Sequence, residues 1–459
     1  MIVMKFGGTS VANCEAITRM IGIVRGKLED RPVVVVSALS KVTDLLYRIA
    51  DKAAEREKSE ADLLLAQLRD RHLKLAEELL SSHPSIVREA CARVTSLCDD
   101  LDAFVAAVCS VGELSQRSKA IIISNGEYLS SNIICCAMNA SGIRTNYMDA
   151  RGFIITDADY LKGEPDMDAI AARVPEAVAA AYVNADAVIT QGFVSATADG
   201  EPTVLGRGGS DYSASLIGMS VDAERIEIWT DVDGVRTADP RRVDNTRCLD
   251  RISFEEAAEM AHFGAKVLHP LTIEPAVRKN IPIYVLNSMN PAGQGTAILQ
   301  SSFIEDGVKS VSCKENIYVI NIFSTKMINT SGFLKKVFEI FSENKVSVDL
   351  ISTSEANISV TVDSSQNIDR VVERLSDFAE VYVDSDKSQV SVIGKNIISL
   401  KGLLEQTFAP LRDCRIYMIS QGASYVNISF VVDRTLLDGV VRQIHKYLFE
   451  TDGENEGRK

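Results

Sequence analysis

The sequence lacks the features of a membrane-spanning, secreted or zinc-binding protein. Its longest apolar runs, such as residues 104–109, are far shorter than the ~20 residues that a membrane-spanning helix needs. The N-terminus has no basic segment followed by an apolar one, so we expect no secretory signal. The nine cysteines form no CxxC pair and the five histidines no HExxH motif. We therefore expect reduced thiols, a cytoplasmic location and no metal site held by side chains.

The chain also lacks an excess of positive charge. Lys and Arg total 49 and Asp and Glu total 63, which leaves a net charge of −14. Nucleic acids and anionic membranes select basic surfaces, so neither is expected as a partner, although a local basic site for a small anion remains possible. The length of 459 residues suggests about three domains.

Short β-branched runs alternate with helical patterns over the first 300 residues or so. This alternation predicts an α/β domain with a mostly parallel sheet. Strands are predicted at 2–6, 33–36, 120–123, 146–148, 187–190, 226–229 and 281–286. Helices are predicted at 15–28, 86–108, 127–140, 170–182, 213–219 and 254–261. Residues 51–80 are rich in charge and leucine and indicate a solvated helix or helical hairpin, with a partner-binding surface as the alternative.

After residue 301 the sequence contains two similar units. Gly332 and Gly402 each precede an apolar helix, and Asn-Ile-Ser occurs at 357–359 and again at 427–429. Each unit has the pattern of a ferredoxin-like βαββαβ fold, and the fixed period indicates a duplication. The polar tail from residue 450 is expected to be disordered.

Two glycine-rich segments each lie between a predicted strand and a predicted helix. The first is Lys-Phe-Gly-Gly-Thr-Ser at 5–10, and the second is Gly-Arg-Gly-Gly-Ser-Asp-Tyr-Ser-Ala at 206–214. Glycine lets backbone N–H groups approach a phosphate, and the following helix N-terminus favours negative charge. Each segment alone is also compatible with an ordinary tight loop, whereas two together suggest a cradle for a polyphosphate. Neither is a Walker A sequence, and the first βα unit has no GxGxxG.

A third segment, Thr-Asp-Val-Asp-Gly at 230–234, follows a predicted strand. It therefore lies at a carboxyl end of the sheet, where ligands of α/β proteins usually bind. It lacks the remaining positions of a calcium loop. A plain Asp-Gly turn is the alternative interpretation.

Together with Phe-Gly-Ala-Lys-Val-Leu-His-Pro at 263–270, these segments resemble those of aspartate kinase (aspartokinase), of the monofunctional, lysine-sensitive type with tandem ACT domains. The resemblance covers essentially the whole chain. It implies an α/β fold: a three-layer αβα amino-acid-kinase (carbamate-kinase-like) domain over 1–300, followed by two ferredoxin-like ACT domains. The first ACT domain would comprise 313–386 and be inserted in the second, 301–312 plus 387–453, with a disordered tail at 454–459.

The resemblance also implies a reaction. ATP would phosphorylate the side-chain carboxylate of L-aspartate to 4-phospho-L-aspartate, the first step toward lysine, threonine and methionine. A carboxylate is already ionised at pH 7, so no general base is needed, and catalysis rests on positioning and positive charge. Another amino-acid kinase, such as glutamate 5-kinase or acetylglutamate kinase, and an amino-acid-sensing pseudokinase are the alternatives.

The family pattern assigns roles residue by residue. The catalytic residues would be Lys5, Gly8, Gly209 and Asp211, with Asp211 orienting Lys5. The substrate residues would be Ser37, Thr43, Glu127, Arg207 and Ser210, with Arg207 on the α-carboxylate and Glu127 on the α-ammonium of aspartate. The nucleotide residues would be Lys5, Gly7, Gly8, Thr230, Asp231, Arg236, Arg241, Lys266 and Val267. Arg236 departs from the tyrosine common in lysine-sensitive relatives. Mg²⁺ would arrive with ATP, held by phosphates and water.

Regulation by an end-product amino acid is implied by the tandem ACT units. Lysine is the expected inhibitor; lysine with threonine, or with S-adenosylmethionine, is the alternative. Its site would comprise Met327, Thr330, Gly332, Phe333, Leu334, Ser347, Val348, Asp349, Ser354 and Glu355. We expect a homodimer through the ACT domains, and a tetramer as a further possibility. No homoserine dehydrogenase domain is expected.

Overall fold

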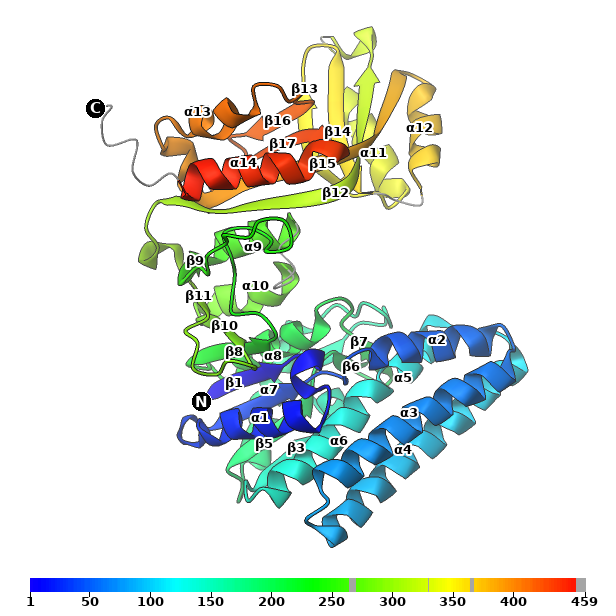
Figure 1. The fold of residues 1–459 in the computed structure, drawn as a ribbon. Helices are drawn as coiled ribbons and strands as arrows, with labels where there is room; N and C mark the ends of the chain where they lie inside the picture. Colours follow the sequence, from blue (N-terminus) through cyan, green and yellow to red (C-terminus); the bar gives the residue numbers. More distant parts are fainter. Residues whose placement is uncertain (264–269, 329, 364–366, 451–459) are drawn as a thin grey trace. The chain divides into compact units, whose positions relative to one another are not determined.

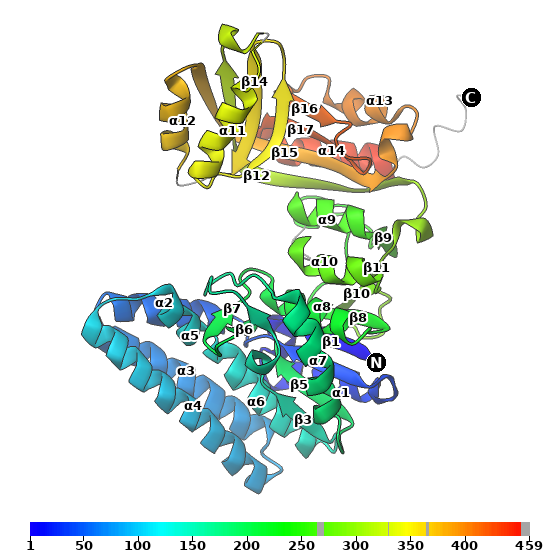
Figure 2. The same cartoon turned by 180° about the vertical axis from the view of Figure 1, so that it is seen from behind.

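The computed structural model describes residues 1–263, 270–328, 330–363 and 367–450, and the chain forms two compact units (Figures 1 and 2). The first unit comprises Met1–Val235 and Val267–Gln300, and the second comprises Arg236–Lys266 and Ser301–Lys459. The tail predicted to be disordered lies outside the described residues, apart from Glu450. No helix in the described part of the chain is long and apolar enough to cross a bilayer.

The first unit is built on a mostly parallel sheet. The neighbouring strands are, in order, β3 (Thr145–Met148), β5 (Ala187–Gln191), β2 (Pro32–Val36), β1 (Ile2–Phe6), β8 (Arg225–Thr230), β10 (Ile283–Asn287) and β11 (Thr296–Leu299). All neighbours along this order are parallel except β10 and β11. A smaller sheet holds β4 (Ile155–Thr156), β6 (Val194–Thr197) and β7 (Pro202–Val204).

Both faces of the large sheet are covered, which explains why its strands are apolar throughout. Ile2, Met4 and Phe6 on β1 belong to one apolar cluster with residues of the helices on that side. Val3, between them, points to the opposite face because side chains alternate along a strand. There it lies 3.7 Å from where a Cβ would be added at Gly218 of the helix on that face.

The helices of the first unit are α1 (Cys14–Arg25), α2 (Val42–Ala54), α3 (Lys58–Leu79), α4 (Pro84–Val111), α5 (Gln116–Ile123), α6 (Asn125–Ala140), α7 (Met167–Ala181), α8 (Gly209–Ser220) and α10 (Pro270–Lys279). Helices α3 and α4 lie side by side as a hairpin (Figures 1 and 2). Arg69 on α3 bridges to Asp99 and Asp102 on α4 at 2.7 and 2.6 Å. The helical prediction for 51–80 is thus confirmed.

One predicted strand is wrong. Residues 120–123 form the end of helix α5 and not a strand. Ser115 caps this helix by accepting a hydrogen bond from the Ser118 amide. Ala120, Ile122 and Ile123 of this apolar run are buried, and a short buried run does not distinguish helix from strand by its periodicity. The other strands predicted in the first 300 residues are confirmed within a few residues.

The second unit contains a six-stranded antiparallel sheet in the order β13 (Val348–Thr353), β14 (Asn357–Asp363), β12 (Gly307–Phe323), β15 (Glu380–Lys395), β17 (Asn427–Asp433) and β16 (Met418–Gln421). Its helices are α11 (Phe333–Glu343), α12 (Ile368–Ser376), α13 (Leu403–Phe408) and α14 (Leu437–Phe449). The segment from Arg236 adds β9 (Arg251–Ser253) and α9 (Phe254–His262).

The two long strands β12 and β15 pass through both repeats. Residues 307–314 of β12 pair with the C-terminal half of β15, which also pairs with β17. Residues 317–323 of β12 pair instead with β14 and with the N-terminal half of β15. Each repeat therefore takes one edge of its four-stranded sheet from a strand that it shares with the other repeat.

Candidate active site

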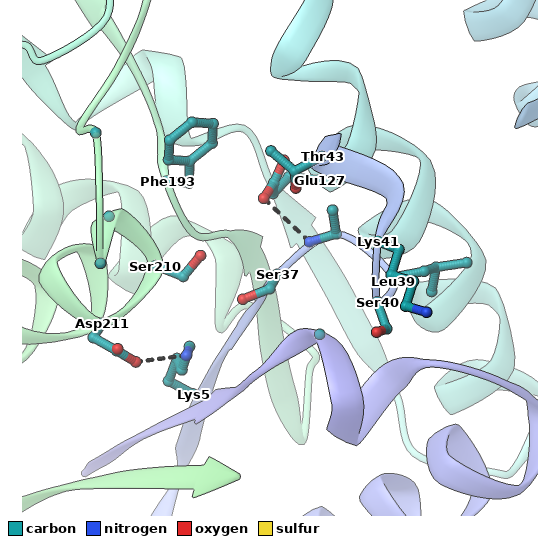
Figure 3. A pocket seen from close by; sticks show the side chains of 15 residues that line it. Lys5, Ser37, Leu39, Ser40, Lys41, Thr43, Glu127, Phe193, Ser210 and Asp211 are labelled. Atoms are coloured by element: carbon teal, nitrogen blue, oxygen red, sulfur yellow. Dashed lines mark hydrogen bonds and ion pairs between the residues drawn. The ribbon is translucent and has the colours of Figure 1, made fainter. Parts of the chain in front are cut away.

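A pocket of about 250 Å³ lies at the carboxyl end of the parallel sheet in the first unit (Figure 3). Strand β1 ends in the Gly7-Gly8 turn and β2 ends at Val36, so both loops open at the same edge. The first turns of α2, α6 and α8 complete the walls. The lining residues are Lys5, Gly8, Ser37, Ala38, Leu39, Ser40, Lys41, Thr43, Glu127, Phe193, Gly206, Gly208, Gly209, Ser210 and Asp211.

One side of the pocket carries an ion pair. Lys5 Nζ, near the end of β1, lies 2.5 Å from Asp211 Oδ1 in the first turn of α8. The two side chains are only 10% and 15% exposed. A carboxylate in a first helical turn also benefits from the helix dipole. The pair fixes the lysine ammonium at the floor of the pocket, where it faces an incoming anion.

At two glycines of the pocket lining, neighbouring groups approach the backbone closely. A Cβ added at Gly8 would lie 3.0 Å from the Ala38 carbonyl oxygen, and one added at Gly209 would lie 2.7 Å from Phe193 Cδ2. Gly208, which precedes α8, has φ of +74°, a conformation that L side chains rarely adopt. The amides of these turns therefore border the pocket without side chains that would fill it.

A buried carboxylate lies across the pocket from the ion pair (Figure 3). Glu127, in the first turn of α6, is 3% exposed, and its Oε1 accepts a hydrogen bond of 3.2 Å from the Ala38 amide. Its Oε2 has no hydrogen-bond partner among the described residues. Burial raises the pKa of Glu127 to about 8. A cationic group in the pocket would supply the missing partner and favour the ionised form.

The remaining predicted substrate residues divide between the pocket and the surface. Ser37 directly follows β2, Thr43 opens α2 and Ser210 belongs to the first turn of α8, and all three line the pocket. Arg207 is exposed and is absent from the described residues that line the pocket. Gly7 is also absent from that lining, although a Cβ there would lie 3.6 Å from Lys5 Nζ.

Lys5 and Gly8, which are also predicted nucleotide residues, line the pocket, whereas Thr230, Asp231, Arg236 and Arg241 are not among its lining residues. Thr230 ends β8 in the first unit and Asp231 follows it, and the threonine hydroxyl donates a hydrogen bond to the Asp231 carboxylate at 3.2 Å. Arg236 and Arg241 belong to the second unit. There Arg236 donates to Thr246 at 2.7 Å, and Arg241 is paired with Asp239. Lys266 and Val267 lie outside the described residues.

Several lining residues were not predicted from the sequence: Ala38, Leu39, Ser40, Lys41, Phe193 and Gly206. Ser40 and Lys41 lie in the loop between Ser37 and Thr43. Because both of those residues were predicted to bind substrate, the loop between them could have been predicted to line the pocket as well. Lys41 has φ of +66° and Phe193 has φ of +68°. Left-handed backbone at residues other than glycine clusters at functional sites, but the sequence does not reveal it.

The predicted effector residues gather around the start of α11 and strand β13 in the second unit. Gly332, with φ of +85°, precedes α11, so the helix begins at Phe333 and its first turn contains Leu334. Ser347 and Val348 mark the start of β13, and Ser354 and Glu355 follow its end. Asp349 is the exception among them, because its side chain is only 4% exposed and is already paired. Met327 lies in a short turn at 325–327, and Thr330 is exposed between that turn and α11.

The described residues contain no group of three or more His, Cys, Asp or Glu side chains placed to hold a metal ion. None of the nine cysteines, all of which lie within the described residues, forms a disulfide.

Comparison with known protein families gives matches along almost the whole chain. Residues 1–287 match the amino acid kinase family, and residues 320–377 and 390–448 match an ACT domain. Aspartokinase 1, chloroplastic, of Arabidopsis thaliana is 36% identical over 475 residues, which cover 99% of this chain and 81% of the relative. Lysine-sensitive aspartokinase 3 of Escherichia coli K12 is 34% identical and is covered to 99%, with 98% of this chain.

Solved structures give the same result. The structure of E. coli aspartokinase III with aspartate and ADP in the R-state has a TM-score of 0.85 and 32% sequence identity. The match covers 98% of this chain and all of the other. The T-state of that enzyme with lysine and aspartate has a TM-score of 0.80 and covers 98% of this chain and 99% of the other.

Proposed function

This chain belongs to the aspartokinases of the amino acid kinase family: it is an aspartate kinase, and we propose that its chemistry takes place in the pocket between Lys5 and Glu127. It transfers the γ-phosphoryl group of ATP to the side-chain carboxylate of L-aspartate, and lysine inhibits it through the ACT domains. The observation that supports this location is the arrangement of a fixed ammonium on one side and a desolvated carboxylate on the other.

The step itself is an in-line displacement at phosphorus. An oxygen of the aspartate side chain forms a bond to the γ-phosphorus while the bond to the ADP oxygen breaks. The electron pair of that bond leaves with ADP, and no proton has to be removed from the nucleophile. The protein must therefore bring two anions together, and Lys5 offsets their repulsion at the transferring group. Asp211 holds that ammonium in place.

The amino acid would be oriented by groups at the other side of the pocket. Glu127 accepts hydrogen bonds from the α-ammonium of aspartate. The hydroxyl-bearing residues Ser37, Thr43 and Ser210 line the same pocket as Glu127 and Lys5. Orientation of this kind lowers the activation barrier, because the translational and rotational entropy is already lost when the substrate binds. Arg207 would bind the α-carboxylate through paired hydrogen bonds, which requires its exposed side chain to turn toward the ligand.

For the nucleotide we propose backbone contacts from Gly7, Gly8 and Gly209, with Thr230 and Asp231 at the neighbouring strand end. Arg236, Arg241, Lys266 and Val267 remain proposed nucleotide contacts from the family pattern alone. Magnesium would enter as the ATP complex, a co-substrate whose ligands are phosphate oxygens and water. Among the described residues, no group of three or more His, Cys, Asp or Glu side chains could hold the ion.

We propose that the ACT repeats mediate a homodimer. Strand β13 is an edge of the six-stranded sheet, and Ile351 on it is 47% exposed. An exposed apolar edge strand favours pairing with a second chain. Pairing of two such dimers into a tetramer is the further assembly that we propose. We also propose a cytoplasmic location, which is supported by nine cysteines without a disulfide among them, because reducing compartments keep thiols in this state.

The test is the initial velocity of acyl-phosphate formation, trapped with hydroxylamine, using ATP with aspartate, glutamate or N-acetylglutamate. We expect turnover with aspartate alone, and a lower velocity when lysine is added. Turnover with glutamate but not aspartate would contradict the substrate. Inhibition by threonine and not by lysine would contradict the effector.

A further inference from the structure

The carboxylate of Asp349 is already occupied on both oxygens by groups of its own chain. Its Oδ2 lies 2.7 Å from Lys314 Nζ, and its Oδ1 lies 3.3 Å from His262 Nε2. The three residues come from β13, β12 and α9, which are distant in sequence (Figure 1). The Asp349 side chain is 4% exposed and that of Lys314 is 19% exposed.

This cluster keeps the carboxylate ionised without solvent. Burial alone would raise the pKa of Asp349, but hydrogen bonds from His262 and Lys314 outweigh it and lower the pKa below its usual value. Burial likewise opposes the charge on Lys314, yet hydrogen bonds to Asp349 and Asp363 raise its pKa. An unpaired ionised carboxylate at this depth would be costly, so any ligand that removes one partner must replace its charge.

We infer that Lys314 and His262 are built-in occupants of the effector site, and that the ammonium of the effector binds Asp349 by displacing them. This rests on the proposed assignment of Asp349 to the lysine site. The exchange replaces one ammonium by another at the same carboxylate, so the buried charge stays compensated. Lys314 keeps a partner after displacement, because Asp363 lies 2.9 Å from its Nζ and is 59% exposed.

Displacement also releases a helix. His262 is the last residue of α9 and adjoins the Phe-Gly-Ala-Lys-Val-Leu-His-Pro segment at 263–270 in the sequence. The His262–Asp349 contact ties this helix to the edge strand of the sheet that carries the proposed effector residues. Loss of that tie on effector binding changes what holds α9 to the sheet.

Two quantities follow from the exchange. The observed affinity for lysine is reduced by the cost of displacing Lys314, so removing that ammonium strengthens lysine binding. The effect of bound lysine on activity depends on the His262 contact, so replacing that side chain weakens the coupling between binding and inhibition.

The experiment is calorimetric titration of the full-length protein with lysine, alongside inhibition curves and thermal unfolding. Lys314→Met is expected to bind lysine about tenfold tighter than the wild type, a factor within the usual range for coupled sites. Lys387→Met is the matched control, because the ion-pair partner of Lys387 is Asp433, at 2.9 Å, and not Asp349. It is expected to leave lysine binding unchanged.

Two more variants keep the test decisive. Lys314→Arg keeps the charge, and its guanidinium can pair with the carboxylate through two hydrogen bonds, so lysine should bind severalfold more weakly. This variant tests the inference even if Lys314→Met does not fold. His262→Gln should bind lysine at least as tightly as the wild type yet show weaker maximal inhibition. Lysine binding that is unchanged or weaker in folded Lys314→Met, or unchanged in Lys314→Arg, overturns the displacement.

The wild-type titration separates this inference from the function on which it rests. A wild-type protein that neither binds lysine nor loses activity with it contradicts lysine regulation, and the displacement with it. A wild-type protein that binds lysine, with no change in either Lys314 variant, contradicts the displacement alone.

Discussion

Lys5 Nζ lies 2.5 Å from Asp211 Oδ1, although Lys5 belongs to the first strand, β1, and Asp211 to helix α8, far away in the sequence. Folding of the sheet brings them together, because β1 pairs with β8, the strand that follows α8. Both side chains are largely shielded from water, so the attraction between them is stronger than in an exposed surface ion pair.

Replacing Lys5 with alanine should lower kcat by roughly 10²- to 10³-fold, because the cation that stabilises the transferring phosphoryl group is lost. The KM for aspartate should change much less. Steady-state kinetics with hydroxylamine trapping measures both. The control is Lys52→Ala, which removes a lysine from a surface cluster with Glu55 and Glu57. Near-normal kcat in Lys5→Ala would show that the ammonium does not act on the phosphoryl group.

Aspartate binding should release a proton from Glu127. The carboxyl has a pKa of about 8 in the empty pocket, so it is largely protonated at pH 7. An ammonium bound beside it lowers that pKa, and about one proton leaves on binding at pH 6–7. Affinity for aspartate should therefore rise with pH up to about 8 and then level off. Calorimetry in buffers of different ionisation enthalpy measures the proton count, which should vanish in Glu127→Gln.

The same carboxyl should affect stability with the opposite trend. The folded-state pKa of Glu127 lies above the value of 4.5 expected for an unfolded chain. Between pH 4.5 and 8 the unfolded state thus binds fewer protons than the folded state, and stability falls as pH rises through this window. Glu127→Gln lacks this dependence. Denaturant unfolding at pH 5 and pH 8 should show the wild type losing stability relative to the variant, and equal losses in both would refute the assignment.

Gly209→Ala should destabilise the protein by about 1–3 kcal/mol, because its Cβ would lie 2.7 Å from the Phe193 ring. Phe193 lines the pocket, so kcat/KM should fall as well. Gly22→Ala is the matched control in a helix, since nothing lies within 4 Å of its Cβ. It should gain about 0.5–1 kcal/mol. Thermal unfolding and steady-state kinetics of both variants test this prediction. A Gly209→Ala variant with wild-type stability and activity would contradict it.

Lys41→Gly should make the protein slightly more stable and less active. Lys41 has φ of +66°, which costs a lysine about 1–2 kcal/mol more than a glycine before the entropy of glycine is counted. The variant also removes a cation from the pocket lining, so the KM for its anionic substrates should rise severalfold. Asn280→Gly, at another left-handed position, is the control and should leave kinetics unchanged. Unchanged KM values in Lys41→Gly would show that this cation does not contact substrate.

Local sequence patterns predicted most of the fold because they are set by short-range physics. Apolar runs of β-branched residues indicated the buried parallel strands, and the repeated Gly332 and Gly402 positions indicated two related units. The run 120–123 misled because its burial on several sides hides the helical period. The shared strands β12 and β15 could be suspected from the family resemblance, but their pairing depends on contacts between distant segments.

By itself the sequence determined the family, the reaction and the strand-end positions of Lys5 and Ser37, since motif order and chain direction decide these. Only the tertiary structure decided that Lys5 pairs with Asp211 and that Glu127 is buried with one oxygen to which no described residue donates a hydrogen bond. It also decided that Asp349 pairs with Lys314 and His262. Each of those facts depends on desolvation and on distances between residues far apart in the chain, which no local pattern encodes.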